Sequence, residues 1–412
     1  MQEIAVIGGG AAGMTAAVFA ARAGASVTLF EKNDRLGKKL RITGKGRCNV
    51  TNDCDFEEFL SNVPRNPRFL YAALHRFPTS ETKNFFESIG VPLKTERGKR
   101  VFPVSDRASD IVSALESECR RAGCAIEHKK VISLSETNGK IDGIITSDGK
   151  RRFDAVILCT GGLSYKATGS DGDGYRMAYG VGHSVTALVP SLVPIVEDGH
   201  ICAGMQGLSL KNVKLIIKAN KTGKIIYEDF GELMFTHFGL TGPLVLSASA
   251  HMTDIEKGKY TATIDLKPAL DEKTLDARLV SDFTKYSNKD FINSLDSLLP
   301  QKMISSFVRL SGIDMRKKVN SITKEERKRL VTLLKHFEIP LLRLRPIDEA
   351  IITSGGIDVK EINPKTMESK LVRGLYFAGE IIDVDAYTGG FNLQIAFSTA
   401  VLAGESAANQ IS

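Results

Sequence analysis

Three glycines and one acidic residue near the start of the chain have the types and spacing that bind a dinucleotide. Gly8, Gly10 and Gly13 follow an apolar run, and Glu31 comes 18 residues after the third glycine. The first glycine permits a tight turn, the second lets a pyrophosphate approach the backbone, and the third allows close helix packing. Unpaired N–H groups at the start of that helix attract phosphate. A carboxylate at position 31 can accept both hydroxyls of an adenosine ribose and would repel a 2′-phosphate, so an NADP-type ligand is disfavoured here.

A second glycine turn follows an apolar segment further along the chain. Residues 153–159 predict a strand that leads into Thr160, Gly161 and Gly162. Ligands of doubly wound sheets bind at such carboxyl ends of strands. We therefore expect this turn to line the same ligand.

A third turn lies more than 340 residues after the first, where an apolar strand ends in Gly379 and Glu380. A carboxylate there could bond the ribityl hydroxyls of FAD. A helix beginning near Asn392, just after Gly390, could point its N-terminal N–H groups at the flavin pyrimidine edge. FAD would occupy both the first and the last turn, whereas NAD would not need the last. The turns together predict FAD.

The hydropathy pattern predicts the elements that position these turns. Residues 4–32 predict a strand, an Ala-rich helix and a second strand. Residues 37–52, beginning at Gly37, are basic and glycine-rich without apolar periodicity, so we expect a loop that runs along the cofactor. We expect Ser105 or Asp106 to cap a helix that ends near residue 122. Residues 391–409 predict a closing helix.

Residues 125–158 predict a small antiparallel unit. One strand would lead to Asn138-Gly139, a second to Asp148-Gly149, and the apolar segment before Thr160 would be the third.

Changes of composition predict the domain organisation. At 412 residues the chain exceeds a single small core. Prolines near 190 and 346 border a segment that alternates like strands and then reads as amphipathic helices over about 270–340. We expect a discontinuous nucleotide-binding domain (1–190 and 347–412) with an inserted β subdomain (191–268) and an inserted helical subdomain (269–346). The predicted class is α/β.

The composition indicates the kind of environment in which the protein works. With 42% hydrophobic and 25% charged residues, the chain reads as an ordinary globular protein. Residues 4–21 are uncharged, but four glycines interrupt them, so we expect no membrane span. The chain enters its first strand at once, and its six cysteines include no C-x-x-C pair. These features predict a cytoplasmic protein with reduced thiols and no structural zinc.

Most of the net charge of +7 gathers in one region. Residues 314–345 hold ten Lys or Arg against four acidic residues. One interpretation is a solvated helical face, and the other is a surface that attracts an anionic partner such as RNA. No aromatic residues alternate with these charges, as a base-stacking platform would need.

Few residues are candidates for catalysis, because a flavin carries out hydride transfer itself. Cys48 and Cys54 invite comparison with disulfide reductases, but the five residues between them exceed the usual four. One extra residue would rotate a helical partner by about 100° away from its mate. His237 is a candidate proton donor, with a turn-fixing role as the alternative, and Tyr387 is a second candidate. A second nicotinamide-binding turn is absent, so NAD(P)H, if used, would bind transiently in the substrate cleft.

Four longer motifs resemble one bacterial family, the aminoacetone-oxidase-type or BaiN-like NAD(P)/FAD-dependent oxidoreductases. They are residues 44–52, 167–175, 235–243, and 366–370 continuing through Asn392-Leu393-Gln394, and the resemblance covers essentially the whole chain. It implies a glutathione-reductase-type FAD-binding fold with a β-barrel-like and helical insertion. It also implies that a residue near Val131 meets adenine through its backbone. Besides residues from the three turns, the cofactor-lining residues that it implies are Ala12, Lys32, Arg47, Cys48, Asn49 and Leu393.

Three functions fit this sequence. The leading hypothesis is an FAD-dependent oxidoreductase that acts on a small-molecule substrate bound between the flavin domain and the insertion. The alternatives are a flavin-dependent oxidase of a small amine such as aminoacetone, and a flavoprotein that acts on or binds RNA through residues 314–345.

Overall fold

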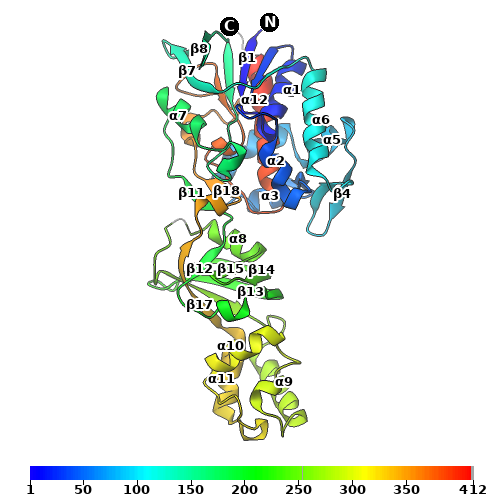
Figure 1. Cartoon of the computed structure of the whole chain (residues 1–412), viewed down its shortest axis with the longest axis vertical. Helices are drawn as coiled ribbons and strands as arrows, with labels where there is room; N and C mark the ends of the chain where they lie inside the picture. Colours follow the sequence, from blue (N-terminus) through cyan, green and yellow to red (C-terminus); the bar gives the residue numbers. More distant parts are fainter. Residues whose placement is uncertain (253, 410–412) are drawn as a thin grey trace. The chain divides into compact units, whose positions relative to one another are not determined.

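The computed structural model describes residues 1–252 and 254–409. Thr253 and residues 410–412, which the sequence assigns to the β subdomain and to the end of the nucleotide-binding domain, lie outside the described residues. The chain forms two compact units (Figure 1). Unit 1 comprises Met1–Ser191 with Ile347–Ser412, and unit 2 comprises Leu192–Pro346.

A five-stranded parallel sheet forms the centre of unit 1, in the order β19–β10–β1–β2–β6. Its strands are β1 (Glu3–Ile7), β2 (Ser26–Phe30), β6 (Ala125–Glu127), β10 (Ala155–Leu158) and β19 (Leu375–Phe377). The register pairs Ile7 with Leu158, and Leu158 with Phe377, so β1, β10 and β19 end side by side. β10 is apolar and buried throughout, as expected of a parallel strand covered on both faces. The predicted α/β Rossmann-type fold is confirmed.

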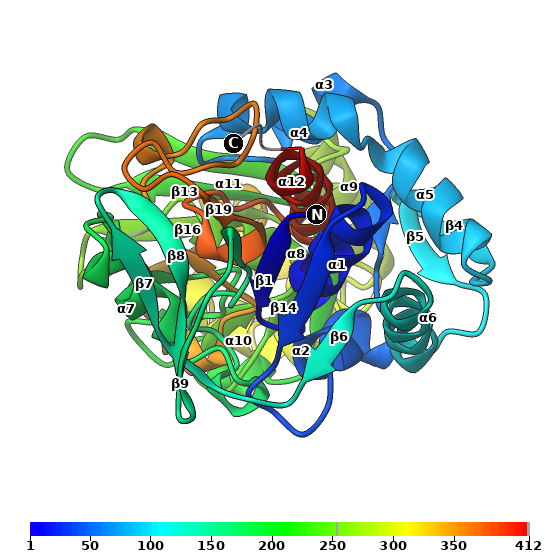
Figure 2. The same ribbon diagram turned by 90° about the horizontal axis from the view of Figure 1, so that it is seen from above.

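Two helices of low charge pack against each other beside this sheet (Figure 2). They are α1 (Ala11–Arg22) and α12 (Phe391–Ala408). A methyl group on Gly404 of α12 would lie 2.6 Å from the carbonyl oxygen of Ala16 and 3.1 Å from the nitrogen of Ala20. The two helices therefore approach to backbone contact, which only small residues permit.

The predicted antiparallel sheet is present, but one of its three predicted strands belongs to the parallel sheet instead. β7 (Val131–Thr137), β8 (Lys140–Thr146) and β9 (Gly149–Arg151) form a three-stranded antiparallel sheet. The apolar segment before Thr160 is β10 of the parallel sheet instead. Its uninterrupted apolar residues suit burial on both faces, whereas β7 alternates between buried and exposed positions.

Two local predictions are also corrected. Helix α6 (Ala108–Arg121) starts after Arg107, and no described side chain caps it. The carboxylate of Asp106, one of the predicted caps, instead pairs with Arg47 and Lys94. The expected loop over 37–52 contains the short helix α2 (Lys38–Ile42), a 3₁₀ turn (Thr43–Gly46) and β3 (Thr51–Asn52).

The rest of unit 1 consists of short elements around the sheet. Their bounds are α3 Phe56–Ser61, α4 Tyr71–Arg76, α5 Thr79–Ser88, β4 Leu93–Glu96, β5 Arg100–Pro103, α7 Asp173–Gly180, β11 Val189–Ser191 and β18 Ile352–Ser354. β3 pairs with β5 and β5 with β4, while β11 pairs with β18.

Unit 2 contains a closed six-stranded barrel, in the order β12–β15–β14–β13–β16–β17. The strands are β12 (Ile195–Glu197), β13 (Ser209–Ala219), β14 (Ile225–Phe235), β15 (Gly239–Thr241), β16 (Tyr260–Asp265) and β17 (Phe337–Leu344). The inserted β-barrel is thus confirmed. The assignment of 269–346 to helices is wrong for β17, which closes the barrel by pairing with β12 and β16.

The helices of unit 2 are α8 (Pro243–Ser249), α9 (Glu272–Lys285), α10 (Gln301–Ser311) and α11 (Lys324–Lys335). Helix α11 packs on α9 and α10. A capping box, in which Thr323 and Glu326 exchange hydrogen bonds, fixes its start. Among the described residues of both units, no helix combines the length and apolar character needed to cross a membrane.

The helix crossing at Gly404 gives a test of the fold. We expect Gly404→Ala to lower the free energy of unfolding by about 1–3 kcal/mol, since overpacking outweighs the gain in helix propensity of about 1 kcal/mol. Gly180→Ala is the matched control, because a methyl group on this exposed helical glycine would meet nothing within 4 Å. Urea denaturation should show the loss only in the first variant; equal stability of both would contradict the observed helix contact.

Candidate cofactor site

The first glycine turn has the geometry that a pyrophosphate requires. A methyl group on Gly13 would lie 1.7 Å from the carbonyl oxygen of Gly8, which itself has φ +105°. A methyl group on Gly10, by contrast, would meet nothing within 4 Å. No described side chain caps α1, and its first turn holds no acidic residue. The helix therefore begins with unoccupied N–H groups beside open space, as a phosphate site needs.

Glu31 lies at the end of β2, directly beside this turn. It is 8% exposed, and one carboxylate oxygen accepts the N–H of Gly9 at 2.7 Å. The other oxygen accepts the backbone N–H of Asn33 at 2.8 Å and its side-chain amide at 2.6 Å. Gly37 closes the same corner, since its N–H donates to the carbonyl of Gly9 at 2.9 Å. The carboxylate is thus held in place next to the helix start.

The ends of β10 and β19 converge on the first turn. A methyl group on Gly8 would lie 2.5 Å from the carbonyl oxygen of Cys159. Gly379, with φ +79°, would bring a methyl group within 2.8 Å of the Cβ of Ala12. A methyl group on Gly162 would lie 3.0 Å from a carboxylate oxygen of Glu380. The structure therefore brings the three predicted turns together at one edge of the sheet.

Glu380 is part of a polar network that the sequence did not indicate. One carboxylate oxygen pairs with the Nζ of Lys39 at 2.7 Å. The other accepts the N–H of Thr353 at 2.9 Å and the hydroxyl of Ser164 at 3.2 Å. A carboxylate has about four acceptor positions, so capacity remains for a ligand hydroxyl. No local sequence signal links Lys39 to a carboxylate 341 residues away.

The start of α12 is tightly constrained. A methyl group on Gly390 would lie 2.4 Å from the backbone of Thr51. The side chain of Asn392 accepts the N–H of Ala386 at 2.9 Å and donates to the Ala386 carbonyl at 2.7 Å. Leu393 follows, half-buried, on the first turn of the helix. No described side chain caps α12, so its first N–H groups remain available.

Among the buried polar atoms that have no hydrogen-bond partner within the described residues, three lie in the segments that follow β2 and β10. They are Oγ1 of Thr160, Oδ1 of Asn49 and Nε of Arg41. Buried polar groups are nearly always paired, so orphaned atoms point to a missing ligand or ordered water. Thr160 and Asn49 are predicted cofactor residues. Arg41 is not, because the basic composition of its segment does not single it out.

The two cysteines of the first segment are free thiols. Burial raises the pKa of Cys48 to about 12, as it does that of Cys54. Neither thiol has the thiolate character of a redox nucleophile.

The remaining predicted cofactor residues are held by other contacts. The guanidinium of Arg47 pairs with Glu96 and Asp106 and lies 4.0 Å from the centre of the Phe102 ring. Lys32 pairs with Asp171 and Asp173. Burial acts to lower the pKa of Lys32, but the two carboxylates outweigh it and raise this pKa. Val131 is buried at the start of β7.

The two proton-donor candidates lie in different units. His237 is in unit 2, between β14 and β15, with an exposed ring that meets Phe238 edge-on. Tyr387 is in unit 1, where its N–H donates to the carbonyl of Asn62 and its own carbonyl accepts from the Asn392 side chain. Tyr387 is thereby anchored beside the start of α12.

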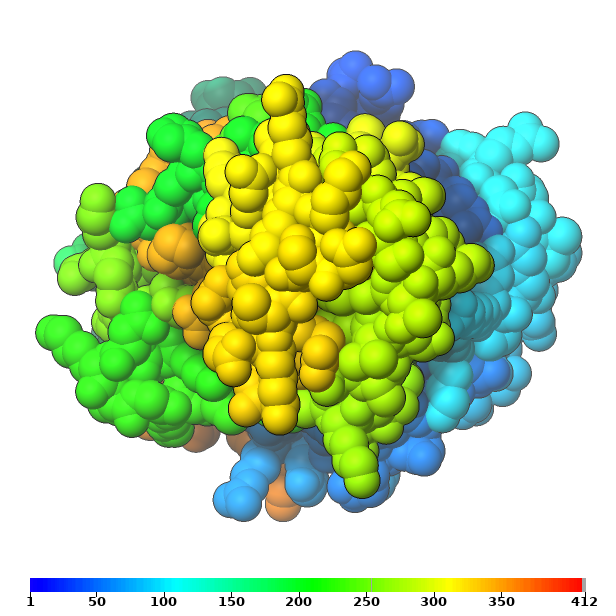
Figure 3. Space-filling view, turned by 90° about the horizontal axis from the view of Figure 1, so that it is seen from below, coloured from blue at the N-terminus to red at the C-terminus, as the bar shows by residue number. Residues whose placement is uncertain are grey.

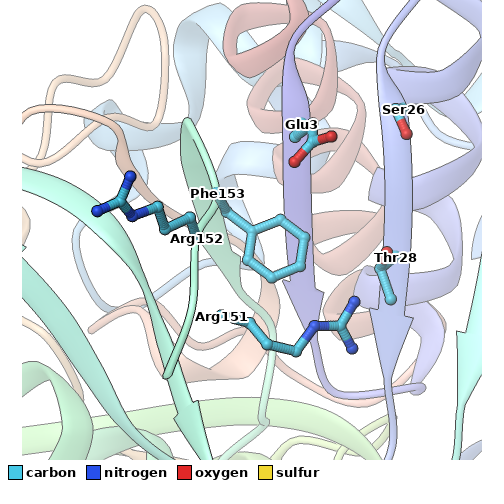
Figure 4. A pocket seen from close by; sticks show the side chains of 6 residues that line it. All are labelled: Glu3, Ser26, Thr28, Arg151, Arg152 and Phe153. Carbon is cyan, nitrogen blue, oxygen red and sulfur yellow. The ribbon is translucent and has the colours of Figure 1, made fainter. Parts of the chain in front are cut away.

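A hollow of about 260 Å³ lies at the opposite end of β1 and β2 from the glycine turn (Figure 4). Its lining includes the first residues of both strands and Phe153. Figure 4 shows the guanidinium of Arg151 below the Phe153 ring. This guanidinium pairs with Glu127 at 2.7 Å and lies over the Phe30 and Phe153 rings. The hollow is therefore remote from the residues predicted to bind cofactor.

Gly10→Ala tests the cofactor site without disturbing the fold. The added methyl group would occupy the space left for a phosphate, so we expect FAD affinity to fall at least about tenfold. The free energy of unfolding of the apoprotein should change by less than about 1 kcal/mol, because the methyl group meets no protein atom. Fluorescence titration with FAD and urea denaturation measure the two quantities. Unchanged FAD affinity in a folded Gly10→Ala variant would contradict the proposal that this turn binds the phosphates.

The chain is similar along nearly its whole length to known proteins. Residues 2–406 match the family model described as HI0933-like protein Rossmann domain. A 3-dehydro-bile acid delta(4,6)-reductase of Clostridium scindens is 32% identical to this chain, and the match covers 100% of both proteins. A ribosomal RNA dihydrouridine synthase of Haemophilus influenzae is 32% identical, over 97% of this chain and 96% of the other.

A solved structure supports the fold. The 3-ketosteroid-delta4-(5alpha)-dehydrogenase of Rhodococcus jostii, at 16% identity, matches with a TM-score of 0.55 over 99% of this chain and 97% of its own. The family model and the full-length relatives confirm the family resemblance, and the chain belongs to the HI0933-like family of Rossmann-type flavoprotein oxidoreductases.

Proposed function

We propose that this protein is an FAD-dependent reductase that adds two hydrogens across a carbon–carbon double bond conjugated to a carbonyl group. The observation that carries the proposal is the pair of full-length relatives, whose names describe different substrates. Reduction of a 3-oxo steroid at its 4,6 double bonds and formation of dihydrouridine from uridine are both reductions of this kind. The reaction that the two relatives share is therefore a better guide to the reaction of this protein than either of their substrates.

The residues of unit 1 fit a bound FAD. Glu31 would hold the adenosine ribose, the backbone of Val131 would meet the adenine, and the start of α1 would hold the pyrophosphate. Glu380, with Gly161 and Gly162, would line the ribityl chain. When bound, FAD supplies the hydride that reduces the double bond.

The start of α12 would lie beside the flavin pyrimidine edge. Its N–H groups, with Asn392 fixing the preceding segment, would favour negative charge there. The reduction also needs a proton, for which Tyr387 and His237 are the two candidates. NAD(P)H is the proposed source of electrons, bound transiently because the sequence holds no second nicotinamide-binding turn.

An anaerobic reduction experiment tests the reaction type. We expect NADH or NADPH to bleach the flavin absorbance of the holoprotein, and a 3-oxo-4,6-diene steroid or a uridine-containing ribosomal RNA transcript to restore it. Stopped-flow absorbance measures both steps, with a saturated ketone as the matched control for the acceptor. Bleaching by a small amine, but not by either nicotinamide, would favour the amine oxidase alternative and overturn the proposal.

RNA is the second candidate substrate, and the charge of unit 2 favours it. Several cations of the region 314–345 are engaged: Arg327 pairs with Asp276, Lys335 with Asp265 and Lys317 with Glu326. Others are exposed and form no ion pair with any described residue. They are Arg316, Lys324, Lys328 and Arg329, together with Arg343 on β17. Figure 3 shows the face of unit 2 over α10 and α11, in yellow to gold.

Neutralising the unpaired cations tests RNA binding. We expect K324Q/K328Q/R329Q to weaken binding of a ribosomal RNA transcript and to reduce the slope of log K against log salt by about 2, at roughly 0.7 per lost phosphate contact. The matched control is K211Q/K221Q/K224Q, which removes the same charge from exposed positions of the β13–β14 hairpin. Filter binding at several salt concentrations measures both. Equal slopes for the two variants would contradict an RNA surface on α11.

A further inference from the structure

Two cysteines outside the cofactor site are brought together by the backbone at the end of α6. Gly123 has φ +84°, and its N–H donates to the carbonyl of Arg120 at 3.0 Å. The N–H of Cys124 donates to the carbonyl of Cys119, also at 3.0 Å. These two bonds define a Schellman motif, in which the side chains at the positions of Cys119 and Cys124 contact each other. The proximity of the two thiols therefore follows from the way the helix ends.

Both thiols face helix α1, on which α6 packs (Figure 2). The sulfur of Cys119 donates to the carbonyl of Met14 at 3.4 Å, and that of Cys124 to the carbonyl of Ala17 at 3.4 Å. Each thiol carries one hydrogen, so the Cys119 proton can instead turn to Cys124 when that sulfur is ionised. In that arrangement a hydrogen bond from Cys119 lowers the pKa of Cys124 and raises that of Cys119.

The two cysteines also differ in solvent exposure. Cys119 is fully buried, whereas Cys124 is 7% exposed and lies between the exposed residues Gly123 and Ala125. A small oxidant arriving from solvent would therefore meet Cys124 first. Cys124, the cysteine with the lower pKa, is thus also the less completely buried residue of the pair.

We propose that Cys119 and Cys124 form a peroxide-sensitive dithiol that closes to an intrachain disulfide. The Cys124 thiolate attacks hydrogen peroxide, the O–O bond breaks, and a sulfenic acid forms with release of water after proton transfer. The Cys119 sulfur then attacks the Cys124 sulfur, the S–S bond forms, the S–O bond breaks, and a second water leaves. Two thiols lose two electrons and two protons, and one peroxide becomes two waters.

The other described cysteines lack this arrangement. Burial raises the pKa of Cys48 and of Cys54 to about 12, and burial likewise raises the pKa of Cys159 and of Cys202. A high pKa leaves little thiolate to react with peroxide near neutral pH. Oxidation at low peroxide concentration should thus be selective for the pair on α6.

Tryptic digestion of the oxidised holoprotein gives a direct test, because Arg120 and Arg121 lie between the two cysteines. Cleavage separates them into peptides 108–120 and 122–129, which only a disulfide can join. We expect mass spectrometry after peroxide treatment to find these peptides linked, and dithiothreitol to release them. Peptide 48–65, which holds Cys48 and Cys54, is the internal control and should keep its mass.

Two variants test the order of attack. Cys119→Ser should leave a sulfenic acid on Cys124 that dimedone traps at least about ten times faster than any modification of Cys48, whereas Cys124→Ser should leave Cys119 unmodified. Circular dichroism of each variant checks that the fold is retained. The proposal is overturned if peptides 108–120 and 122–129 stay separate at a peroxide dose that already oxidises peptide 48–65. It is also overturned if Cys119 in the Cys124→Ser protein is the faster thiol.

Discussion

The contact on which unit 1 depends is the one between Gly13 and the carbonyl of Gly8, with the Cys159 carbonyl on the other side of the turn. At both positions even a single methyl group would collide with backbone. Since the strand, the turn and the helix touch through their main chains, the direction of α1 relative to β1 is set almost without side chains. The start of α1 is thereby fixed at the edge of the sheet, where its N–H groups face open space rather than protein.

Sheet order then brings distant segments to this edge. β10 lies between β1 and β19, and all three run parallel and end in register. The segments that follow them must therefore emerge side by side, although they are separated by hundreds of residues. The close approach of Gly379 to Ala12, and of Glu380 to Gly162, is a consequence of this arrangement. The ion pair between Lys39 and Glu380 adds charge compensation at the same place.

Charge is used differently in the two units. Around the proposed cofactor site, the basic residues Lys32, Lys39 and Arg47 are matched by carboxylates, so the site is organised before any ligand arrives. On α11 of unit 2, Lys324 and Lys328 face solvent without a described carboxylate partner, next to the paired Arg327. Matched charges orient groups, whereas unmatched ones attract polyanions over longer distances. The proposed cofactor site and the candidate RNA surface thus lie in different units.

The sequence by itself determined the strand–turn–helix at the start of the chain, the position of Glu31 and the α/β class, because glycine spacing and apolar periodicity are local signals that backbone geometry obeys. Alternating segments also indicated an inserted β subdomain, whereas its barrel form was implied only by the family resemblance. Only the tertiary structure placed Phe337–Leu344 in that barrel, since a strand after three amphipathic helices is recognised by its partners β12 and β16 rather than by its own pattern. Likewise, the partners of Glu380 depend on how distant backbone segments meet, and no local composition encodes such a meeting.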